Sequence, residues 1–342
     1  MSQQPIILAL TDGKAGHETQ TQGIVQLLNH QQQYQVEWFN LKLPSKWHYR
    51  WLKWLMKFQL NTAWLAAFLT DEQLTSLKQK QVAFIISAGG NTLIANALLK
   101  KELSQSHPVQ NIVASSLRGI KPEYFDAVFT IDRDKQGIQP FVYYPIAPNK
   151  MLSFDLEGER QQAQRRLNLS SNTIVVSILI GADTKDVQIG TIDEWVNWLS
   201  SLIKQSPEAY FIISTSRRTI NNFEDALNRA FTGYKNVKLI LIGQGNTQNI
   251  QDIIYVANMV ICSPDSTSMV SESLMAGKKL VVPLFSHSKL NDTFQKYYAD
   301  LEREMPLYCG PANIKVDFNV KGLTVINHAQ NIEQVFNKAL NK

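Results

Sequence analysis

Apolar segments that end at a polar or glycine-containing loop, with an amphipathic segment after the loop, recur along the whole chain. The apolar segments lie at 5–10, 82–87, 109–115, 127–131, 173–180, 210–214, 237–242 and 259–262. Strands that alternate with helices form a parallel sheet with helices on both faces. The pattern occurs in two series, separated by the proline-containing segment 140–150 and a charged stretch after it. We therefore predict an α/β fold of two doubly wound, Rossmann-like domains, residues 1–150 and 151–342, facing each other across a cleft.

The composition agrees with a two-domain enzyme. A chain of 342 residues with 44% hydrophobic residues can bury a large core. Cys262 and Cys309 are the only cysteines, which argues against a disulfide framework or a cysteine-rich zinc site and favours a reducing compartment. The first apolar run is too short for a signal peptide, and no apolar stretch has the length of a transmembrane helix. We expect a cytoplasmic protein.

Residues 259–283 form the most informative unit, because they read as strand, polar loop, short helix and strand. Residues that favour helix N-caps fill the loop, and Gly277 is well placed to end the helix. Free N–H groups at the start of such a helix can bind a phosphate or a carboxylate. Glu272, about one turn into the helix, could accept hydrogen bonds from sugar hydroxyls. The alternative is that the loop only caps a helix and Glu272 is a solvated carboxylate.

The first loop, residues 11–18, contains a second candidate site. Gly13 and Gly16 allow a tight turn close to a ligand, but the third glycine of the dinucleotide-binding fingerprint is missing. His17 is a candidate general acid or base, because imidazole titrates near neutral pH. Asp12 is a second candidate. Both side chains also occur in purely structural roles at such positions.

Other strand-end loops belong to the same predicted sheet edges, where ligands collect in open α/β sheets. The loop after 210–214 carries Arg217 and Arg218, and guanidinium groups bind phosphate well. The candidate residues of the other loops are Gly181, Ser216 and Gly243 in the second half and Gly89, Gly90 and Asn91 in the first half. The triplet 132–134 has the Asp-x-Asp pattern of some metal sites, but no further carboxylates surround it, so we expect no metal.

An aromatic and basic stretch follows the first unit. The formal charge of +5 lies within residues 1–150, which hold 15 Lys and Arg against 10 Asp and Glu, and residues 38–70 contain no acid at all. Tryptophan rings beside cations are typical of a helix on an anionic membrane surface. The alternative is a core helix with snorkelling lysines, and no motif supports nucleic-acid binding. The candidate surface residues are Lys46, Arg50, Trp51, Lys53, Trp54 and Lys57.

Three motifs together resemble a known family. The segments TDGKAGHETQ, TSRRT and PDSTSMVSE, in this order, are similar to those of the Elm-type family, named for a plant mitochondrial fission factor and usually placed in the GT-B glycosyltransferase superfamily. The segment from Cys262 to Phe285 also resembles the donor-binding segment of the peptidoglycan lipid-intermediate N-acetylglucosaminyltransferase family. That likeness implies a ribose contact for Glu272. The N-terminal loop of the same family is also glycine-rich and ends in a histidine, similar to Gly13, Gly16 and His17, which implies a base role for His17.

The resemblance and the loops together predict a metal-independent glycosyltransferase. It would move a sugar from a nucleotide-sugar donor to a lipid-linked acceptor of lipopolysaccharide or polysaccharide assembly, on the cytoplasmic face of the inner membrane and without a cofactor. The donor-binding residues predicted from the helix start onwards are Asp265, Ser266, Thr267, Ser268, Met269, Glu272 and Asn291. A sugar-nucleotide epimerase and a non-catalytic scaffold that recruits a partner at a membrane are the alternatives.

Overall fold

The computed structural model describes residues 4–313 and 326–340 and divides the chain into two compact units. The first unit comprises Met1–Phe154 and Ala329–Lys342, and the second comprises Asp155–His328. The first boundary therefore lies four residues beyond the one expected from the sequence. The C-terminal helix α11, His328–Leu340, differs more, because almost all of it belongs to the first unit and not to the second. Phe336 of this helix stacks on Phe129 of the first sheet, with ring centroids 5.6 Å apart.

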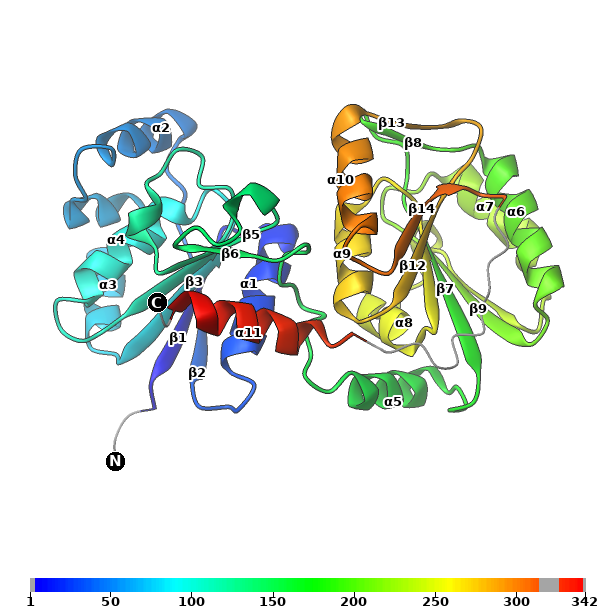
Figure 1. Cartoon of the computed structure of the whole chain (residues 1–342), viewed down its shortest axis with the longest axis horizontal. Helices are drawn as coiled ribbons and strands as arrows, with labels where there is room; N and C mark the ends of the chain where they lie inside the picture. Colours follow the sequence, from blue (N-terminus) through cyan, green and yellow to red (C-terminus); the bar gives the residue numbers. More distant parts are fainter. Residues whose placement is uncertain (1–3, 314–325, 341–342) are drawn as a thin grey trace. The chain divides into compact units, whose positions relative to one another are not determined.

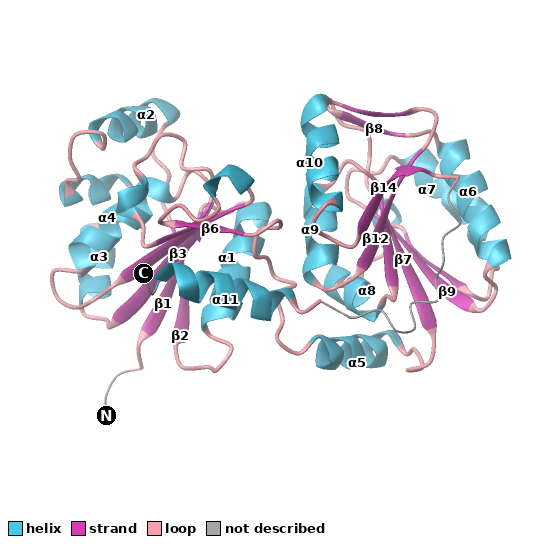
Figure 2. Ribbon diagram, viewed as in Figure 1, coloured by secondary structure: helices cyan, strands magenta, loops and turns pink. Residues whose placement is uncertain are grey.

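The first unit is built on a six-stranded sheet in the order β2-β1-β3-β4-β5-β6, with every neighbouring pair parallel (Figures 1 and 2). All six residues of β1 are buried, as expected for a strand covered on both faces. The edge strand β6 falls inside the segment predicted to be a linker. The strands are β1 Ile6–Thr11, β2 Gln35–Asn40, β3 Val82–Ala88, β4 Gln110–Ala114, β5 Ala127–Thr130 and β6 Phe141–Tyr143.

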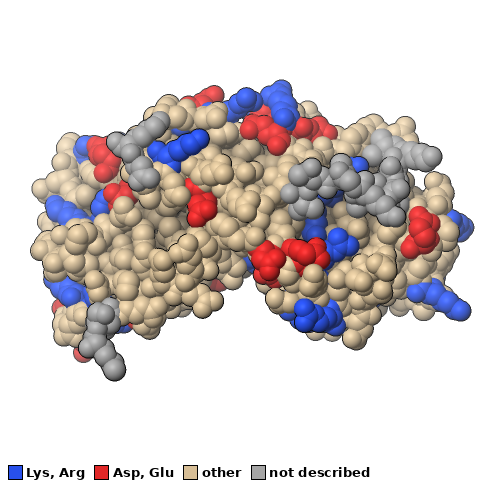
Figure 3. All heavy atoms as spheres, turned by 60° about the horizontal axis from the view of Figure 1, so that its bottom comes forward, with Lys and Arg blue, Asp and Glu red and all other residues tan. Residues whose placement is uncertain are grey.

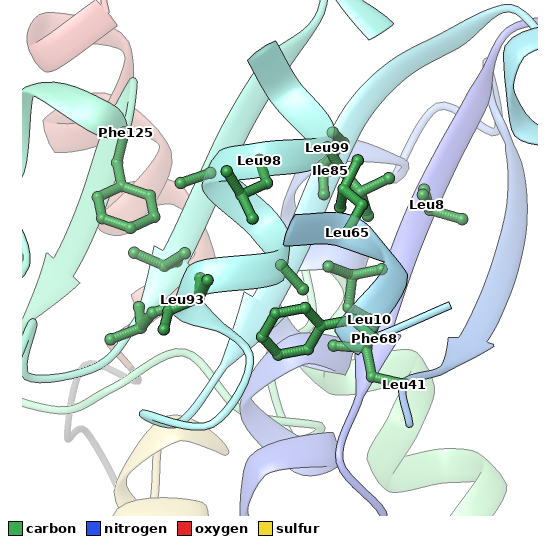
Figure 4. Packing of buried hydrophobic residues seen from close by; sticks show 14 of the residues in the cluster. Leu8, Leu10, Leu41, Leu65, Phe68, Ile85, Leu93, Leu98, Leu99 and Phe125 are labelled. Atoms are coloured by element: carbon green, nitrogen blue, oxygen red, sulfur yellow. The ribbon is translucent and has the colours of Figure 1, made fainter. Parts of the chain in front are cut away.

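Helices cover both faces of this sheet, and one large hydrophobic cluster lies under them. Figure 4 shows Leu93, Leu98 and Leu99 of α4 near Leu65 of the 3₁₀ helix η1 and Phe68, which directly follows η1. The aromatic and basic stretch does not form one continuous helix. Helix α2 ends at Leu55, and η1, which begins at Thr62, packs into the core. The helical segments of the first half are α1 Ala15–Leu28, α2 Lys46–Leu55, η1 Thr62–Ala67, α3 Asp71–Lys78, α4 Leu93–Leu103, η2 Pro122–Tyr124 and η3 Arg133–Lys135.

The second unit repeats the architecture with a parallel sheet in the order β10-β9-β7-β11-β12-β14. A small antiparallel pair, β8 Val187–Ile189 and β13 Ser288–Leu290, extends the loops after β7 and β12. The strands of the large sheet are β7 Ile174–Ile180, β9 Ala209–Thr215, β10 Val237–Ile240, β11 Met259–Cys262, β12 Lys279–Leu284 and β14 Leu307–Pro311. β7, β9, β10 and β11 lie at the strands predicted at 173–180, 210–214, 237–242 and 259–262, although β10 ends two residues early, and β14 was not predicted.

The α-helices of the second unit begin at capping residues, except α7, whose first residue follows Ile220. Thr191 and Glu194 form a capping box at the start of α6, and Ser266 caps α9. Gly277 follows the end of α9 at φ +70°, as predicted for a glycine that ends a helix. The helical segments are α5 Leu156–Leu167, α6 Ile192–Gln205, α7 Asn221–Phe231, η4 Ile242–Gln244, α8 Ile250–Val256, α9 Thr267–Met275 and α10 Asp292–Glu302.

Candidate functional site

The first sheet reverses its strand order between β1 and β3. The chain runs outward from β1 to β2 and then returns to place β3 on the opposite side of β1. In open α/β sheets, ligands bind outside the carboxyl ends of the strands at this switch point. The loop after β1 carries Asp12, and the loop after β3 carries Asn91. The fold thus brings two of the predicted loops together at this edge.

Asp12 is the centre of a hydrogen-bonded cluster at the switch point. Its buried carboxylate lies 2.9 Å from Nδ1 of His17, and Nδ2 of Asn91 donates a hydrogen bond of 2.8 Å to its other oxygen. Asn91 follows Asp12 by 79 residues in the sequence. The structure therefore assembles Asp12, His17 and Asn91 into one group, although the sequence suggested them as separate candidates.

The protonation of this cluster follows from its contacts. Burial acts to raise the pKa of Asp12, but the hydrogen bonds from His17 and Asn91, the His17 charge and the Lys14 N–H outweigh it and hold the pKa below its usual value. An ionised carboxylate only accepts hydrogen bonds, so Nδ1 of His17 donates to Asp12. Nε2 is then the imidazole nitrogen with a free lone pair when the ring is neutral. Asp12 orients the ring as a carboxylate orients the base in hydrolase triads.

The double glycine after β3 allows two functional side chains to pack against the backbone. A Cβ atom on Gly89 would lie 2.2 Å from the His17 ring, and one on Gly90 would lie 2.4 Å from Nε of Arg118. Gly89 also has a φ of +83°, which side chains rarely adopt. A pocket of about 640 Å³ opens beside His17, Gly89, Gly90 and Arg118. The sequence supplied no reason to select Arg118.

The second sheet has its own switch point between β7 and β11, and a buried aspartate lies there too. The carboxylate of Asp265 accepts a hydrogen bond of 2.7 Å from the Arg218 guanidinium and one of 2.6 Å from Ser263. A Cβ atom on Gly181 would lie 2.2 Å from this carboxylate. Gly181, Arg218 and Asp265, all predicted from separate loops, therefore form one cluster.

Arg217 differs from its neighbour Arg218. Arg218 is engaged by Asp265, whereas Arg217 is exposed and has no carboxylate partner within the described ranges 4–313 and 326–340. Ser216 stabilises the turn that carries both arginines, because its hydroxyl accepts a hydrogen bond of 3.1 Å from the Arg218 N–H. Arg217 is thus the arginine of this pair without a carboxylate partner among these residues, whereas Arg218 is half exposed and lines the pocket described below.

The start of α9 has the predicted cap, but its predicted ligand contacts stay untested. The Ser266 hydroxyl accepts a hydrogen bond of 3.4 Å from the Met269 N–H, while Thr267 and Ser268 are exposed in the first turn. Glu272 is only 7% exposed, so it is not the solvated carboxylate of the alternative interpretation. Its role in binding a ribose stays a prediction.

Two further loop residues have structural contacts. Asn291 caps α10 by accepting from the Phe294 N–H, and its Nδ2 donates to Asp186, so both ends of its carboxamide are engaged. Gly243 donates its N–H to the buried Glu224 at 2.9 Å. Glu224 also accepts from Thr215 at the end of β9, which ties the loops after β9 and β10 together. No sequence motif marks Glu224, which lies inside the amphipathic pattern of α7.

A second pocket, of about 700 Å³, lies beside Gly181 and Arg218 in the second unit. Its floor is mostly apolar, with Ile189 and Phe223, and Arg229 contributes a second guanidinium group. Pockets of this size with a few polar groups are typical small-molecule sites. Both units therefore carry a pocket at the switch-point cluster of their sheet.

Helix α2 presents an aromatic face to solvent. Only Leu52 of its ten residues is buried, and exposed tryptophan rings lie among its lysines and arginine. Elsewhere basic and acidic side chains are interspersed, as Figure 3 shows for one face of the molecule. The core-helix alternative is therefore wrong for α2. The exposed fractions are 79% for Trp47, 54% for Trp51, 53% for Trp54 and 69% for the following Phe58.

Sequence comparison decides the family. The profile of the mitochondrial fission ELM1 family matches residues 15–307. The chain belongs to this family. The match includes all three motifs of the predicted resemblance except the first four residues of the N-terminal one. No curated protein sequence gives a significant match.

Solved structures share the fold of this family member at low sequence identity. The UDP-GlcNAc 2-epimerase from Neisseria meningitidis, bound to UDP-GlcNAc, has a TM-score of 0.51 at 13% identity, with 98% of this chain and 91% of that chain covered. The epimerase from Methanocaldococcus jannaschii has a TM-score of 0.50 at 10% identity, covering 99% and 93%. The ADP-heptose lipopolysaccharide heptosyltransferase II of E. coli has a TM-score of 0.48 at 12% identity, covering 98% of both chains. The fold is the predicted GT-B type, with two Rossmann-like units.

Residues 4–313 and 326–340 lack two features that would indicate other functions. No helix in these ranges is long and apolar enough to cross a membrane. No group of three or more His, Cys, Asp or Glu side chains in them could hold a metal ion. Asp132 of the Asp-x-Asp triplet instead accepts from the Asp134 N–H and begins the turn η3.

Proposed function

We propose that the protein is a metal-independent glycosyltransferase that transfers a sugar from a nucleotide-sugar donor to a lipid-linked acceptor of envelope polysaccharide or lipopolysaccharide assembly. The observation that carries this proposal is the His17 imidazole, which Asp12 holds at the switch point of the first sheet. Sugar transfer to a hydroxyl needs a base within reach of that hydroxyl. His17 lines a pocket large enough for a saccharide, and Nε2 is its free nitrogen.

In the proposed reaction, the acceptor oxygen forms the new glycosidic bond while the nucleoside diphosphate leaves. Nε2 of His17 accepts the proton of the attacking hydroxyl, and the Asp12 carboxylate stabilises the imidazolium that forms. The second unit binds the donor. Arg217, which is exposed and unpaired among the described residues, and the first turn of α9 stabilise the charge on the leaving diphosphate.

The acceptor is proposed to be lipid-linked because α2 resembles an interfacial helix. Its exposed tryptophans would enter the headgroup region, and its cations would bind anionic lipid. Each cation near such a surface contributes about 1 kcal/mol to the binding free energy, so several cations together would bind the enzyme to the membrane reversibly. We propose that the protein works in this way at the cytoplasmic face of the inner membrane, with no cofactor and no nucleic acid partner.

Thermal unfolding with a panel of nucleotide sugars tests the proposal. A donor at about 100 times its dissociation constant should add roughly 2.7 kcal/mol to the free energy of unfolding. The R217A variant should lose this shift, and R165A is the matched control, because Arg165 is an exposed arginine of α5 and not of the loop after β9. If no nucleotide sugar stabilises the protein, the proposal is wrong.

The alternative functions predict other outcomes in the same experiments. A sugar-nucleotide epimerase needs no lipid acceptor, so neutralising Lys46, Arg50, Lys53 and Lys57 would leave its turnover unchanged. A non-catalytic scaffold would tolerate alanine at Glu272 and Arg217 without loss of its function, provided that the fold survives. The transferase should instead lose donor binding in both alanine variants.

A further inference from the structure

The pocket beside His17 contains a cation that the proposed reaction has not used. Arg118 lies in the loop after β4, and its guanidinium packs over Gly90. Within residues 4–313 and 326–340, no carboxylate pairs with Arg118, and no side-chain hydrogen bond holds it. A guanidinium group with five unused donors on a pocket wall is suited to an anion of matching geometry.

The backbone at Arg118 is also unusual. Its φ is +51°, and Gly119 follows at +83°, so two consecutive residues are left-handed. A residue with a side chain rarely adopts this conformation, which costs about 1–2 kcal/mol. Strain of this kind persists where the surrounding structure holds it and is concentrated at ligand-binding positions. Here it places the arginine against Gly90, next to Gly89 and the His17 ring.

Helix α2 holds the two loops that form this wall. The Tyr49 hydroxyl donates to the Gly90 carbonyl, and Nζ of Lys53 donates to the Arg118 carbonyl at 3.0 Å. The exposed aromatic helix is thus joined directly to the arginine and to the glycine that makes room for it. A ligand at Arg118 would therefore lie close to the surface element proposed to meet lipid.

The remaining lining of the pocket has both charge and apolar surface. Lys135 is a second cation among the lining residues, and the Asp132 carboxylate is the one acidic group among them. Leu117, Ile120 and Phe129 supply apolar surface. The balance of two cations and one carboxylate favours an anion, and the apolar side chains favour a ligand that carries a hydrocarbon chain.

We propose that this pocket binds the phosphate or diphosphate group of the acceptor, with the Arg118 guanidinium as its anion-binding group, and so presents a saccharide hydroxyl to His17. The identity of the ligand rests on the proposed glycosyltransferase function, whereas the anion site itself does not. Arg118 is a substrate-binding residue in this proposal. No bond is made or broken at it.

Calorimetric titration with two probes tests the site. Inorganic pyrophosphate reports on the anion site, and farnesyl diphosphate adds an isoprenoid chain. The R118Q variant should weaken binding of both probes at least tenfold, R118K should recover part of the loss, and R165Q should change it less than twofold. Unchanged unfolding temperatures would show that the variants are folded.

Three results would overturn the proposal or part of it. Equal binding by wild type and R118Q, or no binding of either probe at millimolar concentration, would remove the anion site. Equal affinity for the two probes would remove the assignment to a lipid-linked ligand. The nucleotide-sugar panel separates this proposal from the function: R118Q should keep the donor-induced shift of the wild type. If the panel gives no shift but R118Q still weakens pyrophosphate binding, the anion site stands and the transferase proposal fails.

Discussion

Replacing Gly89 by alanine should destabilise the first unit by about 2–5 kcal/mol, through two separate costs. The residue has a φ of +83°, and a left-handed residue with a Cβ atom costs about 1–2 kcal/mol. The added methyl group would also lie 2.2 Å from the His17 ring, and overpacking of this kind costs about 1–3 kcal/mol. The His17 ring must then move away from Asp12.

Gly13 provides the matched control. It has a φ of +76°, but an added Cβ atom would meet nothing within 4 Å. The G13A variant should therefore show the backbone cost alone, and the difference between the two variants isolates the contact with His17. Differential scanning calorimetry measures it, because 1 kcal/mol shifts the melting temperature of a domain of this size by about 2–4 °C.

A double-mutant cycle with H17A completes the experiment. Without the imidazole, G89A should cost only the backbone part, so the two substitutions should show a coupling free energy of about 1–3 kcal/mol. The reasoning is refuted if G89A is no more costly than G13A, or if it costs the same in the presence and absence of His17. Either result would mean that Gly89 does not position the candidate base.

Three further outcomes follow from the same contacts. The D12N variant should lose at least about 100-fold in transfer rate, because an amide no longer fixes the His17 tautomer. Comparing the pH profile of kcat/KM of D12N with that of wild type tests this. An unchanged profile would contradict it. The K46Q/R50Q double variant should bind anionic vesicles about 30-fold more weakly in a sedimentation assay, since each cation contributes about 1 kcal/mol, whereas neutral vesicles should show no difference. Burial raises the pKa of Glu194, but hydrogen bonds from Ser286, Thr191 and His287 outweigh it and lower the pKa to about 2. This stabilisation is present above pH 4.5 and is lost as the pH falls towards 2, so acid unfolding in this range should be less steep for E194Q.

The parts of the fold that sequence predicts well are those fixed by local chemistry. The strand that ends at Thr11, the cap at Ser266 and the left-handed Gly277 all follow from hydrophobic runs and from residues with strong turn or cap preferences. Alternation of strands and helices then gives parallel sheets, and the carboxyl edge of each sheet marks where to look for a ligand.

The parts that sequence misses depend on contacts between distant residues. Nothing near Asn91 shows that its carboxamide binds Asp12, and nothing near Arg118 shows that Gly90 makes room for it. The C-terminal helix looks like a continuation of the second series, but the stacking of Phe336 on Phe129 places it in the first unit. Such contacts are decided by packing of the whole unit, which no short pattern contains.

Each of the two switch points contains a buried aspartate, but the hydrogen-bond donor to that aspartate differs, and we expect the chemistry of the two sites to differ accordingly. Each has an aspartate whose side chain is fully buried, and a buried carboxylate needs a donor to stay ionised. Asp12 accepts a hydrogen bond from His17, and an imidazole can both accept and donate a proton, so this pair suits a proton-transfer step. Asp265 accepts a hydrogen bond from Arg218, whose guanidinium has donors and no acceptor, so that pair can only hold charge and geometry. In the proposed reaction, proton transfer is therefore assigned to the first unit and binding of the donor's diphosphate to the second.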